Sequence, residues 1–334
     1  MAISLVQEQD PGAWDRLTAE LDASALISTR WLTAVGAPER RPLCLRVVVG
    51  ARTIGAIGGL IVEPSLPLLR RFGRRLFFYS GPALQASEAG AIPQAVGVVV
   101  DYARERGMAS VDFRSWDYPC VFDPPESMPY RCTRPEYFLD LRGDLNEINA
   151  RMRPRIQEQV KQSLRAGLTF HEAGSPEAVD ELMGLLEATR AIRISKGRGR
   201  YSYFFMPYLS PHALRRLIGS GLARIFYARK DTAVVSAMIA IVSGKRAIAL
   251  LIGSAEEGYR LKAPTLVWFE TIQALKREGV VSFNLGGVPS GSDAGGLAFY
   301  KGSFGAEKKD CVHGATRLMR RSPLHLLTRL VCGK

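Results

Sequence analysis

The stretch between Asn284 and Gly305 holds residue types that can bind and polarise a carbonyl group. It begins Asn284-Leu-Gly286-Gly287-Val-Pro289 and ends Phe299-Tyr300-Lys301-Gly-Ser-Phe304-Gly305. Closely spaced glycines allow a backbone to approach a ligand. A lysine among aromatic residues presents its ammonium with little freedom, which suits it to hold a phosphate or a developing oxyanion. The local pattern also fits a surface lysine beside core aromatics, so it leaves both interpretations open.

A second candidate is a basic segment interleaved with glycine, from Thr189 to Tyr203. Its five cations are Arg190, Arg193, Lys196, Arg198 and Arg200. Guanidinium groups bind phosphate through paired hydrogen bonds, so the segment could clamp a pyrophosphate or an RNA backbone. The predicted substrate-binding residues here are Arg193, Arg198, Arg200 and Tyr203. The alternative is a basic loop on the surface.

The first half of the chain offers an acid and an aromatic residue next to predicted strands. Asp112 lies at the end of the strand that follows Gly107, and Tyr79 follows the strand from Leu76 to Phe78. Strand ends in α/β domains commonly border ligand clefts. Asp112 could take a proton from an attacking amine as a catalytic base, but pairing with Arg114 is the favoured interpretation.

The charge balance and the absent motifs narrow the class of protein. The 334 residues carry 45 Lys and Arg against 32 Asp and Glu, a net charge of +13 that attracts nucleic acid, phosphorylated substrates or an anionic membrane. The sequence has no P-loop, Rossmann glycine fingerprint, zinc-protease motif or nucleophile elbow. Its five cysteines form no C-x-x-C pair and its four histidines are isolated. We expect no metal and no cofactor and, without a signal peptide or spanning stretch, a cytoplasmic protein.

Two halves of similar pattern must position these residues. Asp101–Phe113 aligns with Gln273–Leu285, and Gly55–Val62 aligns with Val235–Val242 at nearly the same offset. Each longer copy is an amphipathic helix that ends at a glycine and is followed by a short apolar strand. Two matches in the same order indicate a duplicated α/β domain, each copy a mixed sheet flanked by helices.

The C-terminal motif resembles the signature of the Fem family (FemABX), non-ribosomal aminoacyltransferases that build peptidoglycan cross-bridges from aminoacyl-tRNA. The family's usual pattern is Phe-Lys-x-x-Phe-Gly after an Asp-x-Gly-Gly turn, and the similarity here extends from about Tyr137 to Asp310. The resemblance implies two tandem GNAT-like (acyl-CoA N-acyltransferase-like) domains, in agreement with the repeat. It gives a first domain of residues 1–145, completed by 312–334, and a second of residues 146–311.

The resemblance also implies a mechanism. An amino acid esterified to tRNA is already activated, so the enzyme has to position an amine and stabilise the tetrahedral oxyanion. Lys301 matches the family lysine that polarises the ester carbonyl. The predicted substrate-binding residues around it are Asn284, Gly286, Gly287, Tyr300 and Phe304. Asn284 stands where the family has Asp, so a base or orienting role of that carboxylate has no counterpart at this position.

The acceptor implied by the family is a phosphorylated or lipid-linked cell-wall precursor or a peptide-like small molecule. The family's peptidoglycan-precursor enzymes place a lysine near an early tryptophan, whereas here Arg30 precedes Trp31 and no lysine follows. We predict Arg30, Trp31 and Tyr79 as substrate-binding residues. In the C-terminal tail Leu324, Leu327 and Leu330 recur every three residues, which favours a helix packed on the first domain over a contact with the membrane surface.

Two other classes of function remain open. One is an acyl-CoA or acyl-carrier-dependent N-acyltransferase of the GNAT superfamily. Such domains cradle a pyrophosphate in a glycine-rich loop between a strand and a helix, but Gly81–Ser87 and Gly258–Pro264 lack closely spaced glycines at that place. The other is a basic protein that binds RNA or a membrane surface without catalysis.

Overall fold

The computed structural model divides the chain into two compact units. Unit 1 comprises residues 1–134 and 310–334, and unit 2 comprises residues 135–309. The residues described are 2–66, 73–118, 128–197, 203–288 and 294–318, so the tail residues Leu324, Leu327 and Leu330 lie outside them. Both divisions fall inside long strands, β7 (Tyr130–Asp140) and β13 (Glu307–Arg317). The divisions predicted from the sequence were 145/146, beyond the end of β7, and 311/312, which also lies within β13.

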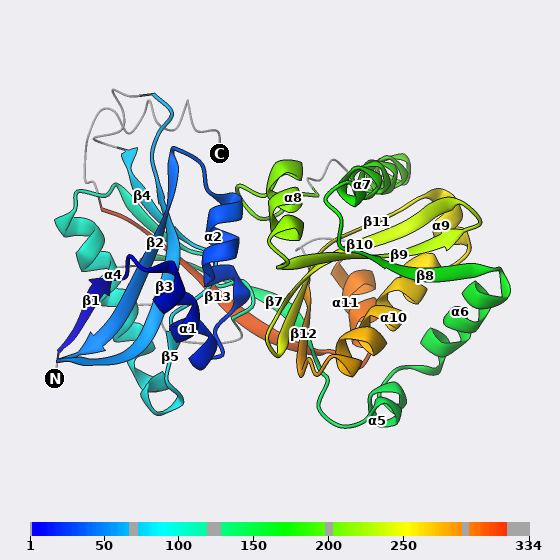
Figure 1. Cartoon of the computed structure of the whole chain (residues 1–334), viewed down its shortest axis with the longest axis horizontal. Coiled ribbons are helices and arrows are strands. Elements are labelled where there is room, and N and C mark those ends of the chain that lie inside the picture. Colours follow the sequence, from blue (N-terminus) through cyan, green and yellow to red (C-terminus); the bar gives the residue numbers. More distant parts are fainter. Residues whose placement is uncertain (1, 67–72, 119–127, 198–202, 289–293, 319–334) are drawn as a thin grey trace. The chain divides into compact units, whose positions relative to one another are not determined.

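Unit 1 contains a sheet in the order β1-β2-β3-β4-β6-β13 (Figure 1). Its other strands are β1 (Ile3–Gln7), β2 (Arg40–Val49), β3 (Arg52–Val62), β4 (Arg75–Phe78), β5 (Ala83–Leu84), which pairs with β3, and β6 (Ser110–Phe113). Its helices are α1 (Pro11–Glu20), α2 (Thr29–Val35) and α4 (Ile92–Glu105), with 3₁₀ turns at Ala25–Ile27 and Ala86–Ala91.

Apolar side chains hold helices on the sheet of unit 1. The buried residues Val96, Val99 and Val100 of α4 pack in one core cluster with the buried side chains of β2, β3, β4 and β6. A second, smaller cluster forms around Trp14 of α1, whose indole Nε1 donates a hydrogen bond to the carbonyl of Ile27 at 2.8 Å. The parallel pair β4 and β6, joined through α4, is thereby fixed in register.

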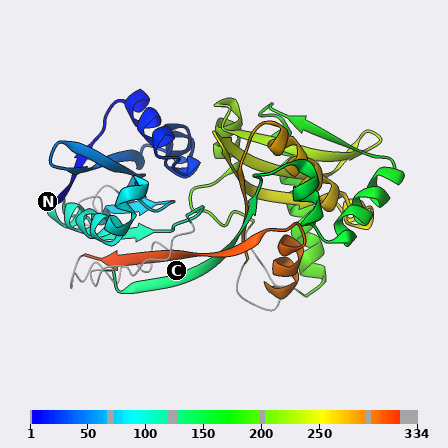
Figure 2. The ribbon, with the colours of Figure 1, turned by 90° about the horizontal axis from the view of Figure 1, so that it is seen from below.

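Unit 2 contains a sheet in the order β7-β12-β11-β10-β9-β8. Its further strands are β8 (Leu168–Ala173), β9 (Ala223–Lys230), β10 (Ala233–Ser243), β11 (Arg246–Ser254) and β12 (Ser282–Gly287). Its helices are α5 (Leu145–Ala150), α6 (Pro154–Arg165), α7 (Ala178–Ser195), α8 (Pro211–Gly219), α9 (Glu256–Arg260), α10 (Ala263–Arg277) and α11 (Ala294–Gly302). Within this unit, α7 and α8 lie on one side of the sheet, and α10 and α6 lie on the other (Figures 1 and 2).

The two units repeat one arrangement of strands and helix. In unit 2, β11 and β12 run parallel and α10 joins them, as α4 joins the parallel strands β4 and β6 in unit 1. The predicted duplicated α/β pattern with mixed sheets is therefore confirmed. Strands β10 and β11 form a hairpin, because Ser243 at the end of β10 pairs with Arg246 at the start of β11.

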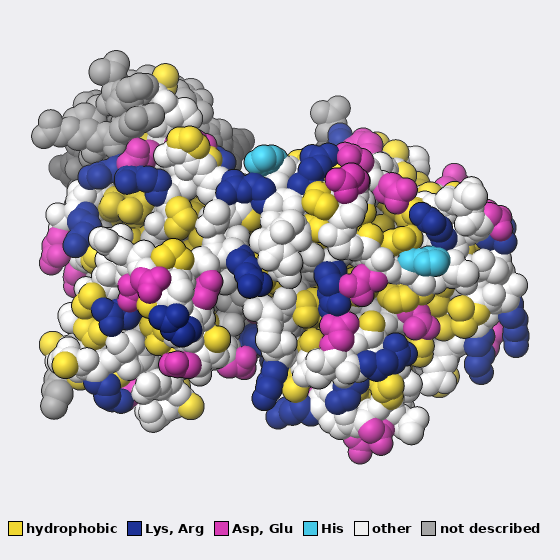
Figure 3. Space-filling view, viewed as in Figure 1, with side chains coloured by type: hydrophobic (Ala, Val, Ile, Leu, Met, Phe, Trp, Pro, Cys, Tyr) yellow, Lys and Arg dark blue, Asp and Glu magenta, His cyan; other side chains and the backbone are white. Residues whose placement is uncertain are grey.

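The surface mixes both signs of charge. On the face drawn in Figure 3, Lys and Arg side chains of each unit are interspersed with Asp and Glu rather than gathered in one continuous patch. Exposed ion pairs account for part of this pattern: in unit 2, Arg224 contacts both Glu172 and Glu278. None of the helices in the described ranges is both long and apolar enough to cross a bilayer.

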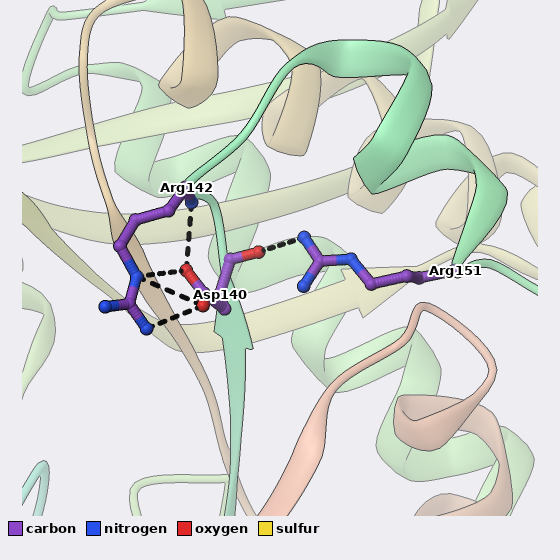
Figure 4. Close-up of polar contacts among 3 residues, drawn as sticks. All are labelled: Asp140, Arg142 and Arg151. Carbon is purple, nitrogen blue, oxygen red and sulfur yellow. Dashed lines mark hydrogen bonds and ion pairs between the residues drawn. The ribbon is translucent and has the colours of Figure 1, made fainter.

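The last glycine of the motif is packed against the start of the unit 2 helices. Gly305 has φ +83°, and a Cβ added there would lie 3.0 Å from the Cβ of Arg151. Arg151 in turn donates a hydrogen bond to the backbone carbonyl of Asp140 at 2.6 Å, as Figure 4 shows. Hydrogen bonds from Arg142 lower the pKa of the Asp140 carboxyl to about 2. Arg151 therefore contacts both Gly305, at the end of the motif, and Asp140, at the end of β7.

Because Arg151 lies so close to Gly305, we predict that Gly305→Ala lowers the free energy of unfolding by more than the cost of the positive φ alone. Gly279 has the same φ of +83° with no atom within 4 Å of the added Cβ. Gly279→Ala should therefore cost about 1–2 kcal/mol for the left-handed conformation, and Gly305→Ala should cost about 1 kcal/mol more because Arg151 must move. Urea unfolding of both variants measures the difference. Equal losses would show that the contact with Arg151 contributes nothing.

Candidate functional site

Lys301 lies at an irregularity of strand β12. Asn284 pairs with Phe138 of β7 and Gly287 pairs with Glu136, so two residues of β12 face one residue of β7. This is a β-bulge, and the positive φ of +80° at Gly286 allows it. The Nζ of Lys301 donates a hydrogen bond to the Gly287 carbonyl at 2.9 Å, and only 7% of the residue is exposed. The lysine is therefore held by the bulge and is not a surface residue.

Asn284 ties the bulge to a buried carboxylate. Its Nδ2 donates to Oε2 of Glu136 at 2.6 Å, and its Oδ1 accepts a hydrogen bond from the Gly286 amide at 2.8 Å. Asn284 and Glu136 are each 1% exposed. Glu136 was not among the predicted site residues, although a charged residue directly before the apolar run Tyr137-Phe-Leu139 was a signal for it.

A cavity of about 650 Å³ opens between α11 and the start of α6. Its wall is lined by Arg153, Pro154, Arg155, Ile156, Gln159, Gly296, Phe299, Tyr300 and Ser303. The guanidinium of Arg153 stacks over the Phe299 ring, 4.2 Å from its centroid, and Phe299 is 53% exposed. The two arginines of this wall, Arg153 and Arg155, make it favourable for an anion.

The motif aromatics differ in their surroundings. Tyr300 lines the cavity, and its hydroxyl lies 3.3 Å from Oγ1 of Thr265, which donates to Gln159. Burial raises the pKa of Tyr300, so the phenol is neutral at ordinary pH. Phe304 is fully buried against Trp268. The prediction that Phe304 binds substrate does not fit this burial, because its ring supports α11 from the core.

The basic segment after α7 is described in part. Arg193 is half-buried in the last turn of α7, and Tyr203 packs on Phe204 with ring centroids 4.9 Å apart. Arg198 and Arg200 lie outside the described residues. The phosphate-binding role of this segment therefore stays a prediction.

In unit 1 the predicted residues lie at the ends of β4 and β6. Arg114 forms an ion pair with Asp112 at 2.9 Å, which confirms the favoured interpretation of that acid. Burial raises the pKa of Asp112, although Arg114 opposes the change. Tyr79 and Trp31 are fully buried and pack edge to face, so neither ring presents a surface to a substrate, whereas Arg30 is exposed.

A buried cluster of polar side chains in unit 1 was not among the predicted sites. Trp116 packs on His313 at 5.9 Å, and the Arg134 guanidinium lies 5.5 Å from the Trp116 ring. Burial lowers the pKa of His313 to about 3 and that of Arg134 to about 10, so the histidine is neutral. These residues are far apart in sequence, which explains why the isolated histidine gave no signal. No three potential metal ligands gather anywhere in the described ranges.

Comparisons with known proteins agree with this architecture. Residues 150–302 match the acetyltransferase (GNAT) domain family. No curated protein sequence matches the chain. Among solved structures, FemX superposes with a TM-score of 0.71 at 12% identity, covering 98% of this chain and 99% of FemX.

Two further structures share the fold over nearly their full lengths. L-PGS from Bacillus licheniformis has a TM-score of 0.55 at 16% identity, with 98% of this chain and 99% of that chain covered. A tandem GNAT protein from the clavulanic acid biosynthesis pathway has a TM-score of 0.52 at 14% identity, with 96% and 100% covered. The predicted fold of two tandem GNAT-like domains is confirmed, and so is the resemblance to the Fem family as a likeness of fold.

The bonds of Asn284 predict a large cost for its removal. Asn284→Ala deprives the Glu136 carboxylate of a donor and the Gly286 amide of its acceptor, which should cost about 2–4 kcal/mol of unfolding free energy. Asn149→Ala is a matched control in the same unit, because Asn149 Oδ1 accepts one neutral bond from Gln273 at 2.8 Å, and about 1 kcal/mol is expected. Denaturant titration of both variants is the measurement, and equal losses would contradict the bonding described for Asn284.

Proposed function

We propose that this chain is an aminoacyltransferase that forms an amide between an amino acid donated by aminoacyl-tRNA and an amine acceptor. The observation that carries the proposal is the position of Lys301, a residue of α11 that is 7% exposed and whose ammonium is bound to the Gly287 carbonyl. The same helix lines the cavity. The match of residues 150–302 to the GNAT domain supports the coarser statement, an acyltransferase. The likeness of fold to FemX supports the finer one.

The chemistry needs little more than positioning and charge. The amine nitrogen attacks the ester carbonyl carbon, and the carbonyl oxygen becomes an oxyanion. The bond from that carbon to the ribose oxygen then breaks, and the proton lost by the amine ends on the ribose hydroxyl. An ammonium carries three N–H donors, so the Lys301 ammonium can serve the Gly287 carbonyl and an oxyanion together. A preformed donor in a site with little water stabilises the oxyanion more strongly than solvent does.

The cavity next to Tyr300 suits the terminal nucleotides of an RNA donor. Its rim carries an exposed aromatic ring, Phe299, on which a base can stack. Arg155 is exposed at the start of α6 and forms no ion pair with any described residue, so it can meet a phosphate. Neither contact depends on the identity of the base, because stacking uses the ring face and the arginine meets the phosphate.

An acyl-CoA donor is the second candidate, favoured by the acetyltransferase domain match. The connection from β11 to α10, where such domains bind pyrophosphate, argues against it in unit 2. The amides of Tyr259, Leu261, Lys262 and Thr265 all donate to carbonyls of this same connection. A Cβ at Gly258 would lie 2.1 Å from the Val235 carbonyl, so the backbone there packs on β10 instead of facing a ligand.

The family resemblance implies a chemical class of acceptor, and we propose that class here. The candidate binding residues are Arg30 and, in the basic segment, Arg193, Arg198, Arg200 and Tyr203. The acceptor is an amine on a phosphorylated or lipid-linked cell-wall precursor or on a peptide-like small molecule. The exposed guanidinium of Arg30 supports an anionic acceptor.

The decisive assay offers the protein labelled aminoacyl-tRNA and labelled acetyl-CoA in parallel, with a panel of amine acceptors. RNase-sensitive transfer into a hydrolysis-resistant amide is the expected result, and Lys301→Met should reduce kcat about 10²–10³-fold without unfolding the protein. Lys161→Met, an exposed position on α6, is the control and should keep full activity. Transfer from acetyl-CoA alone would overturn the proposed donor, and undiminished transfer by folded Lys301→Met would overturn the role of the lysine.

The RNA contact at the cavity is tested separately. Arg155→Ala should raise the KM for aminoacyl-tRNA several-fold with kcat little changed, and should lower the salt dependence of RNA binding by about one counterion. Arg165→Ala removes the same charge from the far end of α6, about 15 Å away, and should have a smaller effect. Binding titrations at several salt concentrations distinguish the two, and equal effects would mean that the cavity is not the RNA site.

A further inference from the structure

Glu136 is a carboxylate buried inside the sheet of unit 2. Glu136 is a residue of β7 and is 1% exposed. Its Oε2 accepts a hydrogen bond from Nδ2 of Asn284 at 2.6 Å. An ionised carboxylate in such a position is costly unless hydrogen bonds and a positive charge compensate it. A neutral residue would serve the strand equally well, so the presence of an acid calls for an explanation.

The Lys301 ammonium is attached to the same bulge as this carboxylate. Gly287 pairs in register with Glu136, and its carbonyl accepts the hydrogen bond from Lys301. A Cβ added at Gly286 would lie 3.4 Å from Nζ, so the ammonium lies directly against the bulge. Asn284 is bound to the bulge through its Oδ1, which accepts a hydrogen bond from the Gly286 amide. The buried Lys301 ammonium is thus bound to the backbone segment Asn284–Gly287, and the buried Glu136 carboxylate is bound to the side chain of Asn284 in the same segment.

Other charged groups near α11 occupy different positions. Arg153 and Arg155 of α6 line the cavity, and the described residues of β12 include no ionisable side chain. Helix α10 carries Glu270, whose pKa burial raises, and Lys276 and Arg277 in its last turn. On β7, Asp140 is bound to Arg142 at the end of the strand. Glu136 is the acid that the described elements bring to the bulge.

We propose that Glu136 is a positioning residue for Lys301, a carboxylate that keeps the lysine protonated and its ammonium directed at the bulge. The inference rests on the proposed function, in which that ammonium meets the oxyanion. It also accounts for Asn284, because the family pattern resembled here has Asp at this position. The negative charge stands one hydrogen bond away, on the neighbouring strand, and Asn284 links it to the glycine turn.

The test moves the charge without changing the shape of the site. Glu136→Gln removes the carboxylate and keeps an acceptor for Asn284, and the double variant Glu136→Gln with Asn284→Asp returns one carboxylate to the pair. The first readout needs no substrate: the reactivity of Lys301 toward an amine-selective reagent is followed against pH by peptide mass spectrometry. A nearby opposite charge raises the pKa of an ammonium, so the labelling midpoint should fall by about one pH unit or more in Glu136→Gln. It should recover most of that shift in the double variant.

The control variant is Glu278→Gln, which removes a carboxylate from the ion pair with Arg224 elsewhere in unit 2. Its Lys301 midpoint should equal that of the unaltered protein. Glu270 is common to every variant, so its own titration cannot produce a difference. The second readout is transfer from aminoacyl-tRNA, where kcat at neutral pH should fall about tenfold in Glu136→Gln with little change in KM, and should recover in the double variant.

An unchanged midpoint in folded Glu136→Gln would overturn the inference. If Glu136→Gln does not fold, the double variant decides: a midpoint near that of the unaltered protein supports the inference, and a midpoint about one unit lower, or failure of this variant to fold as well, overturns it. The labelling result stands apart from the proposed function, because a shifted midpoint with no transfer from any donor would contradict aminoacyl transfer while leaving the pairing of Glu136 with Lys301 intact.

Discussion

The bulge of β12 between Asn284 and Gly287 is the constraint on which the unit 2 site depends. In a regular antiparallel pair, the residues of β12 would alternate across the sheet without interruption, and the Gly287 carbonyl would serve the ladder. The extra residue, made possible by the positive φ of Gly286, turns that carbonyl toward Lys301. One glycine conformation thus orients both the ammonium and the amide of Asn284, and α11 is anchored to the sheet through them.

The two units have similar pairs of parallel strands, but the residues at the carboxyl ends of these strands differ. In unit 2 the ends near β12 gather a lysine, an amide and a buried acid around glycine backbone. In unit 1 the equivalent end of β6 carries the Asp112–Arg114 ion pair, followed by Ser115 and Asp117 with φ values of +46° and +55°. Positive φ at such residues costs free energy and is retained where the surroundings demand it. The two copies share a scaffold, but each end has its own chemistry.

Local patterns in the sequence were sufficient for many of the helices and strands, whereas Lys301 was singled out by the resemblance of its motif to the Fem family. Glycine-terminated helices, the hairpin at Ser243–Arg246 and the start of α6 at Pro154 are short-range features, so propensity and periodicity predict them. Glu136 and the cavity beneath Arg153 depend on contacts between segments more than 100 residues apart, which no local pattern contains. The burial of Phe304 could not be predicted for a related reason, because an aromatic residue in a motif looks the same in sequence whether it faces a ligand or the core.

The strands β7 and β13, each divided between the units, have a consequence for synthesis. The pairing of β13 with β6 joins residues such as Gly314 and Phe113, which are 201 positions apart in the sequence. A chain leaving the ribosome therefore has all of residues 135–309 before it has the strand that extends the sheet of unit 1 beyond β6. Unit 2 can therefore complete its sheet first, while β6 of unit 1 stays an open edge until β13 has been synthesised.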